Sequence, residues 1–289
     1  MQLGFSPQMK ALDIAKIQCQ LKTRLFGQGD KLFYLPVVDS TNARAMHLAH
    51  EQSEEGVVVL ADSQTAGKGR LGRQWVDVAG CNVLSSTLLR PLFPPHWLVM
   101  LGPLAVVNAI THTCGVSATI KWPNDVLIGD RKVAGILIET SHDRLGQLVA
   151  ILGIGVNVNG QHSEDLPTLH QAQAAQYSGA TTLETACGHE VSRELFIVHL
   201  LQAIEADYLV LQQMVTEHSA QELERATRSL RERWRQQLST LGRLIQVRQG
   251  DTVLNGIAED VDDNGELLLR RHSGELVSIS WGDVGYTLR

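Results

Sequence analysis

Residues 64–75, QTAGKGRLGRQW, combine three glycines and three cations directly after an apolar stretch. Glycines let backbone N–H groups approach a ligand closely, and cations neutralise phosphate or carboxylate charge. The spacing matches GxGxxG, but the following pattern is a strand and lacks the acid of a dinucleotide-binding loop. It is not a Walker A loop either. We interpret the segment as an anion-binding loop, because the alternative, a flexible basic surface loop, leaves Trp75 and the glycine spacing unexplained.

A second stretch, KWPND at 121–125, is followed by RKVAGI at 131–136. Pro123 cannot continue a central strand and so ends it. A hairpin turn at 129–130 then brings the chain back alongside. Four polar side chains can therefore converge: Lys121, Asn124, Asp125 and Lys132. The alternative is a capped turn with surface lysines.

The third stretch is GIGVNVN at 153–159. Glycines inside an apolar strand indicate close approach by backbone or ligand. Asn157 and Asn159 are predicted to share one face of the strand. Tight packing of the strand against a helix is the alternative that this pattern leaves open.

Hydrophobic periodicity predicts the elements that position these stretches. Helices are expected from Ser6-Pro7 to about 26, over 42–50, 94–114, 190–214 and 217–240, with a short one within 160–190. Strands are expected over 31–38, 57–64, 82–90, 118–123, 132–140 and 147–158. Several strands are apolar on both faces, which predicts an α/β protein of the α+β type, with a mixed sheet flanked by helices.

The character of the chain changes at Gly242, where short alternating strands begin. Residues 262–265 and 272–274 have the composition of hairpin turns. This segment is predicted to form a small β-barrel.

Composition excludes several classes of protein. The chain has 289 residues, 44% hydrophobic and 19% charged, with a net charge of −6, so it is globular and a poor general DNA-coating protein. The N-terminus lacks a signal peptide, and the apolar stretch 98–110 is interrupted and shorter than the ~18–20 residues of a membrane span. Four scattered cysteines form no CxxC pair and favour the reducing cytoplasm. We therefore expect a cytoplasmic protein that binds neither membrane nor DNA.

Together these stretches closely resemble the biotin protein ligases, or biotin–[acetyl-CoA-carboxylase] ligases. The matching segments are DSTN (39–42), QTAGKGRLGRQW (64–75), KWPNDV (121–126), RKVAGILIE (131–139) and GIGVNVN (153–159), and SWGDVGYTLR (280–289) resembles the family's SH3-like domain. The resemblance implies the biotin/lipoate ligase fold, related to class II aminoacyl-tRNA synthetases. Together with the periodicity, it predicts three parts: an N-terminal helix (1–30), a catalytic domain (31–240) and an SH3-like C-terminal barrel (241–289).

The activity implied by the resemblance uses biotin, ATP and Mg²⁺. Biotin would be activated as biotinyl-5′-AMP and transferred to a lysine of the biotin carboxyl carrier protein of acetyl-CoA carboxylase. Fewer than forty residues precede DSTN, so we expect the form without the DNA-binding domain that some members carry, as a monomer or homodimer. The alternatives are a lipoate or octanoate ligase or transferase, a biotin-responsive repressor and an inactive biotin-binding module.

Site residues carry over from the family motifs. Biotin would be bound by Ser40, Thr41, Asn42, Gln64, Gly67, Lys68, Gly69, Arg70 and Lys132. ATP would be bound by Lys68, Arg70, Arg73, Asn124, Lys132, Asn157 and Arg289. The catalytic residues would be Lys132, Arg70 and Asp125, and a metal would lie at Asp125 and Asn157. The adenine site is expected within 160–185, with Tyr177 as a candidate for stacking. Gly67-Lys68 departs from the usual Gly-Arg, so the loop keeps the charge but loses a bidentate donor.

Removing Arg289 alone should raise the KM for ATP more than the KM for biotin. By the family pattern this arginine reaches the nucleotide phosphates, and loss of one terminal residue should not unfold a barrel. Steady-state kinetics of the truncated protein measure both constants. If both keep their wild-type values, the C-terminal barrel serves only as a scaffold or as a dock for the carrier.

Overall fold

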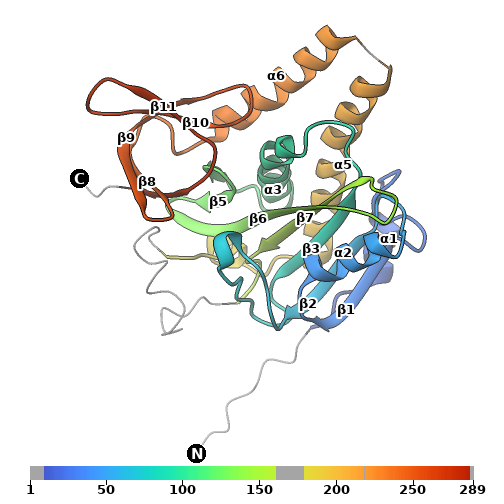
Figure 1. The fold of residues 1–289 in the computed structure, drawn as a ribbon. Coiled ribbons are helices and arrows are strands. Elements are labelled where there is room, and N and C mark those ends of the chain that lie inside the picture. The colour runs from blue at the N-terminus through green and yellow to red at the C-terminus, as the bar shows by residue number, and fades with distance from the viewer. Residues whose placement is uncertain (1–9, 161–178, 218, 287–289) are drawn as a thin grey trace, which may run out of the picture.

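The structure is a computed structural model that describes residues 10–160, 179–217 and 219–286 (Figure 1). Its main body is a seven-stranded sheet with the order β1-β2-β3-β7-β6-β5-β4. The strands are β1 (Leu32–Val38), β2 (Val58–Gln64), β3 (Val83–Leu89), β4 (Thr119–Lys121), β5 (Asp125–Ile128), β6 (Arg131–His142) and β7 (Leu148–Val156). β1 and β2 pair in parallel and the other neighbours are antiparallel, which confirms the predicted mixed sheet.

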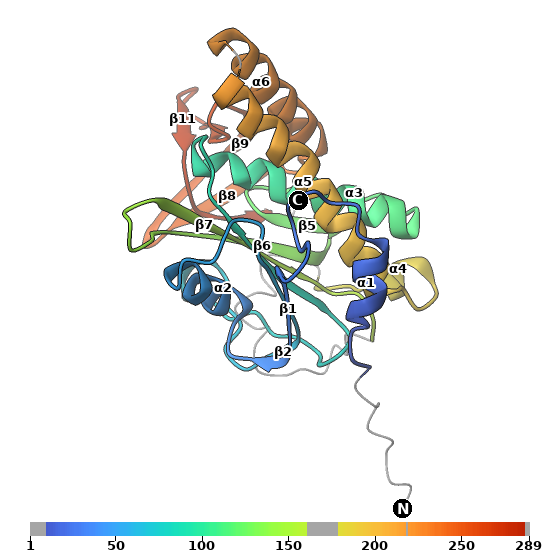
Figure 2. The ribbon, with the colours of Figure 1, turned by 90° about the vertical axis from the view of Figure 1, so that its right-hand side faces the viewer.

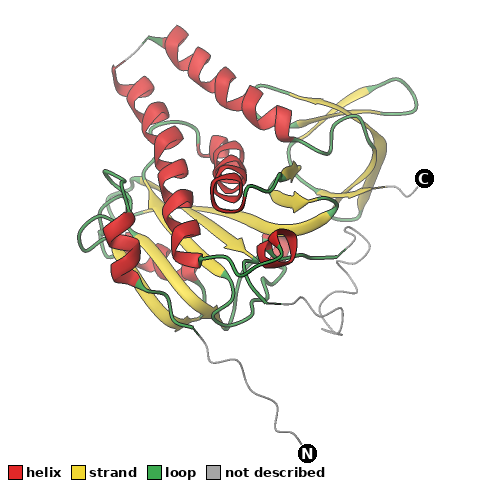
Figure 3. Cartoon of the chain, turned by 180° about the vertical axis from the view of Figure 1, so that it is seen from behind, coloured by secondary structure: helices red, strands yellow, loops and turns green. Residues whose placement is uncertain are grey.

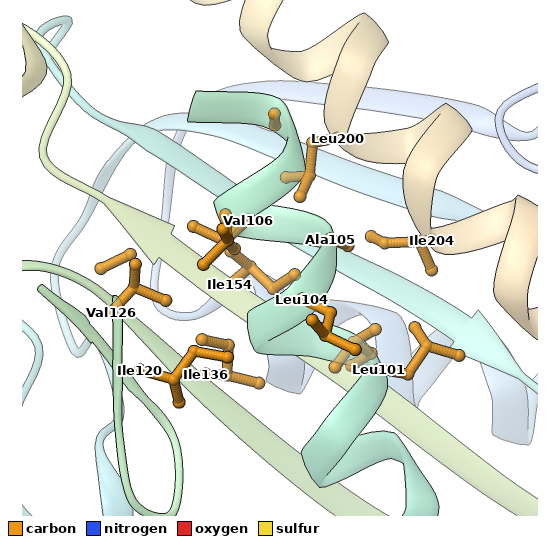
Figure 4. Packing of buried hydrophobic residues seen from close by; sticks show 14 of the residues in the cluster. Leu101, Leu104, Ala105, Val106, Ile120, Val126, Ile136, Ile154, Leu200 and Ile204 are labelled. Atoms are coloured by element: carbon orange, nitrogen blue, oxygen red, sulfur yellow. The ribbon is translucent and has the colours of Figure 1, made fainter. Parts of the chain in front are cut away.

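One face of this sheet is covered by α3 (Leu98–Cys114) and the other by α2 (Thr41–His50), as Figure 2 shows. The alternation of β7 explains the two layers. Leu152 and Ile154 belong to the core that α3 completes, whereas Ile151 packs with α2. Figure 4 shows Ile136 and Ile154 beneath α3. Because apolar side chains are buried on both faces of the sheet, only the strand residues outside these two cores are available to line a functional site.

Helix α3 is apolar on all sides, as a helix between a sheet and a second helix must be. Together with the preceding 3₁₀ turn, residues 95–114 are long and apolar enough to cross a bilayer by length and composition alone, which corrects the shorter estimate made from the sequence. Eleven of its residues are buried, and α5 packs over its outer side (Figure 4). The apolar surface of α3 is therefore used by the protein core.

The predicted N-terminal helix is much shorter than expected. α1 spans Ile14–Gln20, and the Asp13 side chain caps it by accepting from Lys16 N. Beyond Leu21 the chain turns, because the Glu205 carboxylate accepts three consecutive backbone N–H groups, those of Arg24, Leu25 and Phe26. A tertiary contact 179 to 181 residues away thus overrides the helical periodicity.

The remaining helices are α4 (Leu183–Cys187), α5 (Arg193–Glu217) and α6 (Ala220–Gln237). α6 and the C-terminal end of α5 project away from the large sheet in Figure 1. α6 starts at a capping box between Ser219 and Glu222, and only Leu230 and Trp234 are buried among its described side chains. Its alternating charges therefore form a solvated face, as predicted.

Five antiparallel strands form a second sheet at the end of α6, clearly set apart in Figure 3. They are β8 (Leu244–Gln249), β9 (Thr252–Val261), β10 (Leu267–Arg270), β11 (Leu276–Ile279) and β12 (Asp283–Tyr286), in the order β11-β10-β9-β8-β12. The arrangement is that of an SH3-like module, as predicted. The exact boundaries 1–30, 31–240 and 241–289 stay predictions.

A buried ion pair joins α5 to the large sheet. Arg193 Nη1 lies 2.8 Å from Asp62 Oδ1, and the two side chains are 4% and 0% exposed. Arg193 also donates to the carbonyls of Asn82 and Lys10, and the Tyr34 hydroxyl donates to Asp62. Burial and the neighbouring Asp62 raise the pKa of Tyr34 to about 12. One guanidinium thus joins α5 to β2, to the turn before β3 and to the N-terminal segment.

Arg193→Met should lower the free energy of unfolding by about 3–5 kcal/mol, because it leaves Asp62 buried without its cation. Urea denaturation monitored by circular dichroism measures this. The control is Arg228→Ala, which breaks an exposed pair with Glu224 on α6 and should change little. Equal losses in the two variants would mean that Tyr34 alone compensates Asp62.

Candidate active site

A cavity of about 390 Å³ opens on the sheet face that carries α2. This volume lies within the usual range for small-molecule sites. The three stretches singled out in the sequence meet there, together with the start of α2. The lining includes Ser40, Thr41, Asn42, Gln64, Lys68, Gly69, Arg70, Arg73, Trp75, Asn124, Asp125, Lys132 and Asn157.

Glycines on two neighbouring strands make room for the indole ring of Trp75. Gly135 on β6 pairs with Gly155 on β7. A Cβ at Gly155 would lie 2.5 Å from Trp75 Cε2, and one at Gly135 would lie 3.1 Å from Cζ3. The ring thus packs directly on the backbone of the sheet, and Trp75 Nε1 is buried without a hydrogen-bond acceptor in the described part of the chain. Gly135 of the second stretch and Gly155 of the third therefore serve close packing beside the cavity.

The segment 66–75 is a compact hairpin rather than an open loop. Gly69 N donates to Arg73 O over 2.7 Å, and Trp75 N donates to Gly67 O over 2.9 Å. Its tip is a 3₁₀ turn, Arg70–Gly72, in which Gly72 has a φ of 74°. A glycine tolerates this left-handed conformation without strain. The turn directs its cationic side chains to partners on other elements.

Each of the four cations has a polar partner within the protein. Lys68 Nζ lies 3.1 Å from Glu139 Oε1, and Lys132 Nζ lies 2.7 Å from Asp125 Oδ1. Arg70 Nη1 donates to Asn124 Oδ1 over 2.9 Å. Arg73 pairs with Asp283 of β12, so the second sheet reaches the hairpin directly. These partners hold four like charges around one cavity.

Lys132 comes alongside Asp125 through the β5–β6 hairpin, as the sequence predicted. Its ammonium also lies 5.7 Å from the centre of the Trp75 ring. The backbone N of Lys132 donates to Gly179 O, and its carbonyl accepts from Thr181 N. These bonds hold the start of β6 before its pairing with β7 begins at Ala134. The side chain is thereby placed at the centre of the polar lining.

Lys121 is buried next to this group, with only 2% of its surface exposed. Burial lowers its pKa to about 8, and the charge of Asp125 partly opposes that shift. Its ammonium lies 4.9 Å from the centre of the Tyr286 ring in β12. Lys121 therefore lies between the cavity and the second sheet, outside the cavity lining.

The start of α2 supplies the neutral polar groups. Ser40 caps the helix by accepting from Ala43 N. Thr41 donates to Gln64 Oε1 from its backbone N over 2.7 Å and from its hydroxyl over 3.0 Å. Ser86 Oγ lies 2.8 Å from Thr41 Oγ1. Ser40, Thr41 and Gln64 line the same cavity as the cations, and Ser86 supports them from the buried side.

The structure brings together most residues that the sequence predicted for the site. Gly67 lies just outside the main cavity, in an adjoining hollow formed by the hairpin, Leu137 and Glu139. Arg289 and Tyr177 lie outside the described residues. Asn159 does not share a site with Asn157, because its amide bonds to the backbone N and O of Val191. β7 ends at Val156, so the alternation that predicted a shared face no longer applies.

Sequence reasoning missed two acids and one strand. Asp125 begins the short strand β5 instead of a loop. Glu139 and Asp283 pair with loop cations, although neither was singled out. Glu139 stands two positions after Leu137 and four after Gly135, so its period-2 spacing was the available signal.

No cluster of three or more His, Cys, Asp or Glu side chains exists in the described ranges 10–160, 179–217 and 219–286. Among the described residues that line the main cavity, Asp125 is the only carboxylate, and Asn157 is one of the amides. Such a donor set suits Mg²⁺, which binds proteins through one or two carboxylates and completes its shell with water and phosphates.

Two family models match the chain. Residues 34–159 match the Biotin/lipoate A/B protein ligase family, and residues 240–284 match the Biotin protein ligase C terminal domain. The first match contains every cavity residue named above, and the second coincides with the five-stranded sheet.

Several known proteins are similar in sequence to most of this chain. A biotin–[acetyl-CoA-carboxylase] ligase of Paracoccus denitrificans is 36% identical over 83% of this chain and 94% of that protein. A ligase of the same name from Mycobacterium tuberculosis is 31% identical over 91% and 93%. The bifunctional ligase/repressor BirA of Bacillus spizizenii is 33% identical over 91% of this chain and 76% of its own length.

A solved structure extends the agreement to the fold. The biotin protein ligase from Aquifex aeolicus in complex with biotin and ATP matches with a TM-score of 0.71 and 25% identity. The match covers 90% of this chain and 100% of that one. Fold, cavity, family models and relatives agree, and the chain belongs to the biotin protein ligase family.

Proposed function

We propose that this protein activates biotin with ATP to biotinyl-5′-AMP and then transfers the biotinyl group to a carrier lysine. The single observation that carries this proposal is the cavity lining. Four cations and a set of uncharged hydrogen-bonding groups share one small-molecule pocket beside Trp75. A ligand with a charged tail and a neutral polar ring matches such a pocket.

In the first step a biotin carboxylate oxygen attacks the α-phosphorus of ATP, and the bond to the β-phosphate bridging oxygen breaks to release pyrophosphate. Two anions must meet, so the site must offset their repulsion in a position closed to water. Lys132, central in the lining and 2.7 Å from Asp125, would bridge the carboxylate and the α-phosphate. Arg70, Arg73 and Lys68 of the hairpin would neutralise the remaining phosphate charge.

The uncharged ureido ring requires donors and acceptors without net charge. Thr41 and Gln64 are already held together by two hydrogen bonds, so they would meet the ring with little further ordering. Trp75 would cover the apolar part of biotin. Ser40 and Asn42 complete this part of the lining.

In the second step the amine of a carrier lysine attacks the carbonyl carbon of the anhydride. The bond to the phosphate oxygen breaks, AMP leaves, and the amine loses a proton to give the amide. The relatives from Paracoccus denitrificans and Mycobacterium tuberculosis are named for acetyl-CoA carboxylase. We therefore propose that the carrier is the biotin carboxyl carrier protein of that enzyme and that the reaction takes place in the cytoplasm.

We propose that Mg²⁺ enters with ATP and is held by Asp125 and Asn157, because a carboxylate and an amide that line one cavity suit an ion that keeps phosphate ligands. When bound, it would neutralise phosphate charge. Asn124, which donates to Ile136 O and accepts from Arg70, would hold the hairpin over the nucleotide.

Mass spectrometry of a carrier domain incubated with this protein, Mg²⁺-ATP and biotin tests the proposal. One lysine of the carrier should gain a biotinyl group. Lipoate and octanoate, the acids of the alternative reaction, serve as parallel substrates. Transfer of either of these acids instead of biotin would overturn the proposal.

Lys132→Ala should reduce adenylate formation by about 10²-fold or more, the scale of losing one preorganised electrostatic contact. Biotin-dependent pyrophosphate exchange into ATP measures that step. Arg228→Ala, a charge removed from the exposed face of α6, should leave the exchange rate unchanged. Normal exchange in the Lys132 variant would remove Lys132 from the mechanism.

Arg70→Gly should weaken retention of biotinyl-AMP more than its synthesis, because Arg70 fastens the hairpin to Asn124. One lost charge-assisted bond corresponds to roughly 10–150-fold in dissociation rate. Escaped adenylate would acylate lysines of bystander proteins, which an avidin blot detects. A variant that still makes adenylate yet labels only the carrier would show that Arg70 does not retain it.

A further inference from the structure

Glu139 on β6 contacts two different parts of the site with its two carboxylate oxygens. Oε2 accepts from Asn42 Nδ2 over 2.8 Å, and Oε1 pairs with Lys68 Nζ at 3.1 Å. Asn42 belongs to the start of α2, and Lys68 belongs to the hairpin 66–75. One acid thus joins the two walls between which the cavity lies.

The contact to Asn42 fixes the orientation of its amide. A carboxylate only accepts hydrogen bonds, so Nδ2 must face Glu139 and Oδ1 must face the other way. Ser86 Oγ donates to that Oδ1 over 2.6 Å. The amide fits in a niche that exists only because residue 153 is glycine, since a Cβ there would lie 2.1 Å from Oδ1.

From Asn42 the hydrogen bonds continue to the neutral polar groups. The single hydroxyl proton of Ser86 is shared between Asn42 Oδ1 and Thr41 Oγ1, which lies 2.8 Å away. Thr41 in turn donates twice to Gln64 Oε1. Ser86, Asn42 and Thr41 are at most 4% exposed. Buried polar chains of this kind hold their members in one arrangement, because an unpaired member would be costly.

We infer that Glu139 is a positioning residue that couples closure of the hairpin, through Lys68, to the orientation of Asn42, Thr41 and Gln64. This inference rests on the proposed function and adds to it a residue that does not itself line the main cavity. Glu139 would act on biotin through Asn42 and on the hairpin through Lys68.

The lysine at position 68 suits this arrangement. A lysine is a point charge and needs one carboxylate oxygen, which leaves the other for Asn42. An arginine at the same place would form a fork that binds both oxygens of a carboxylate. Lysine at position 68 thus fits an acid that is shared between two partners.

Three variants separate the two contacts. Glu139→Ala removes both, Lys68→Met removes only the contact to the hairpin, and Glu139→Gln keeps an acceptor for Asn42 but loses the charge. Glu54→Ala is the matched control, because it breaks another lysine–glutamate pair, with Lys31, away from the cavity.

We expect Glu139→Ala to raise the KM for biotin by roughly tenfold, and by more than it raises the KM for ATP, since the amide of Asn42 loses a charged partner. Glu139→Gln should keep the biotin KM within about threefold of wild type, because a neutral acceptor restores most of that bond. Glu54→Ala should change neither constant. Equal increases for both substrates in Glu139→Ala, or none, would overturn the inference.

Trypsin cleavage after Arg70 or Arg73, sites that all variants keep, measures closure of the hairpin without any substrate. Glu139→Ala and Lys68→Met should each accelerate cleavage. The double variant should be no faster than Glu139→Ala alone, because both changes break the same contact between Glu139 and the hairpin. Additive rates would show that the two residues act separately. If Glu139→Ala does not fold, Glu139→Gln carries the comparison, because it should match Lys68→Met in cleavage rate.

The cleavage experiment also separates this inference from the proposed function. A wild-type protein that makes no biotinyl-AMP would refute the function, whereas non-additive cleavage would still establish the link between Glu139 and Lys68. Conversely, an active ligase with additive cleavage rates would refute the link alone.

Discussion

The mutual repulsion of four cations around one cavity is the constraint on which the rest of the site depends. Lys68, Arg70, Arg73 and Lys132 converge from one hairpin and one strand. Like charges that line one cavity repel one another. Each cation has a separate partner in the protein. Those partners come from β5, β6, β12 and the turn at Asn124. The charge needed for the reaction therefore determines which elements must meet.

This requirement explains why the second sheet is packed where it is. Asp283 of β12 pairs with Arg73, and Trp122 Nε1 donates to Gly265 O of the turn between β9 and β10 over 3.0 Å. Lys121, buried with a lowered pKa, lies under Tyr286 of the same sheet. The C-terminal module thus contributes charge and packing at the point where KWPND turns, so its removal would affect the site as well as stability.

Much of the fold could be predicted because hydrophobic periodicity and the residues typical of turns and caps are local features of the sequence. The strands of the large sheet, apart from β5, and α2, α3, α5 and α6 lie close to their predicted ranges. The predictions fail where contacts between residues far apart in the sequence determine the structure, or where an element is very short. Glu205 ends the N-terminal helix early by binding the backbone of 24–26, and β5 is too short to show alternation. The site residues were found by motif, but partners such as Asp283, more than 200 positions from Arg73, have no local signal.

The glycines of the third stretch, Gly153 and Gly155, show what the sequence and the structure each contribute. A sequence can show that Gly153 and Gly155 interrupt an apolar strand, but not what fills the space. In the structure Gly153 admits the amide of Asn42, and Gly155 admits the ring of Trp75. Because alternate residues of β7 face the same side, a period of two places a polar anchor and an aromatic wall next to each other. Two missing side chains therefore bring α2 and the hairpin onto the same strand, and the cavity lies between them.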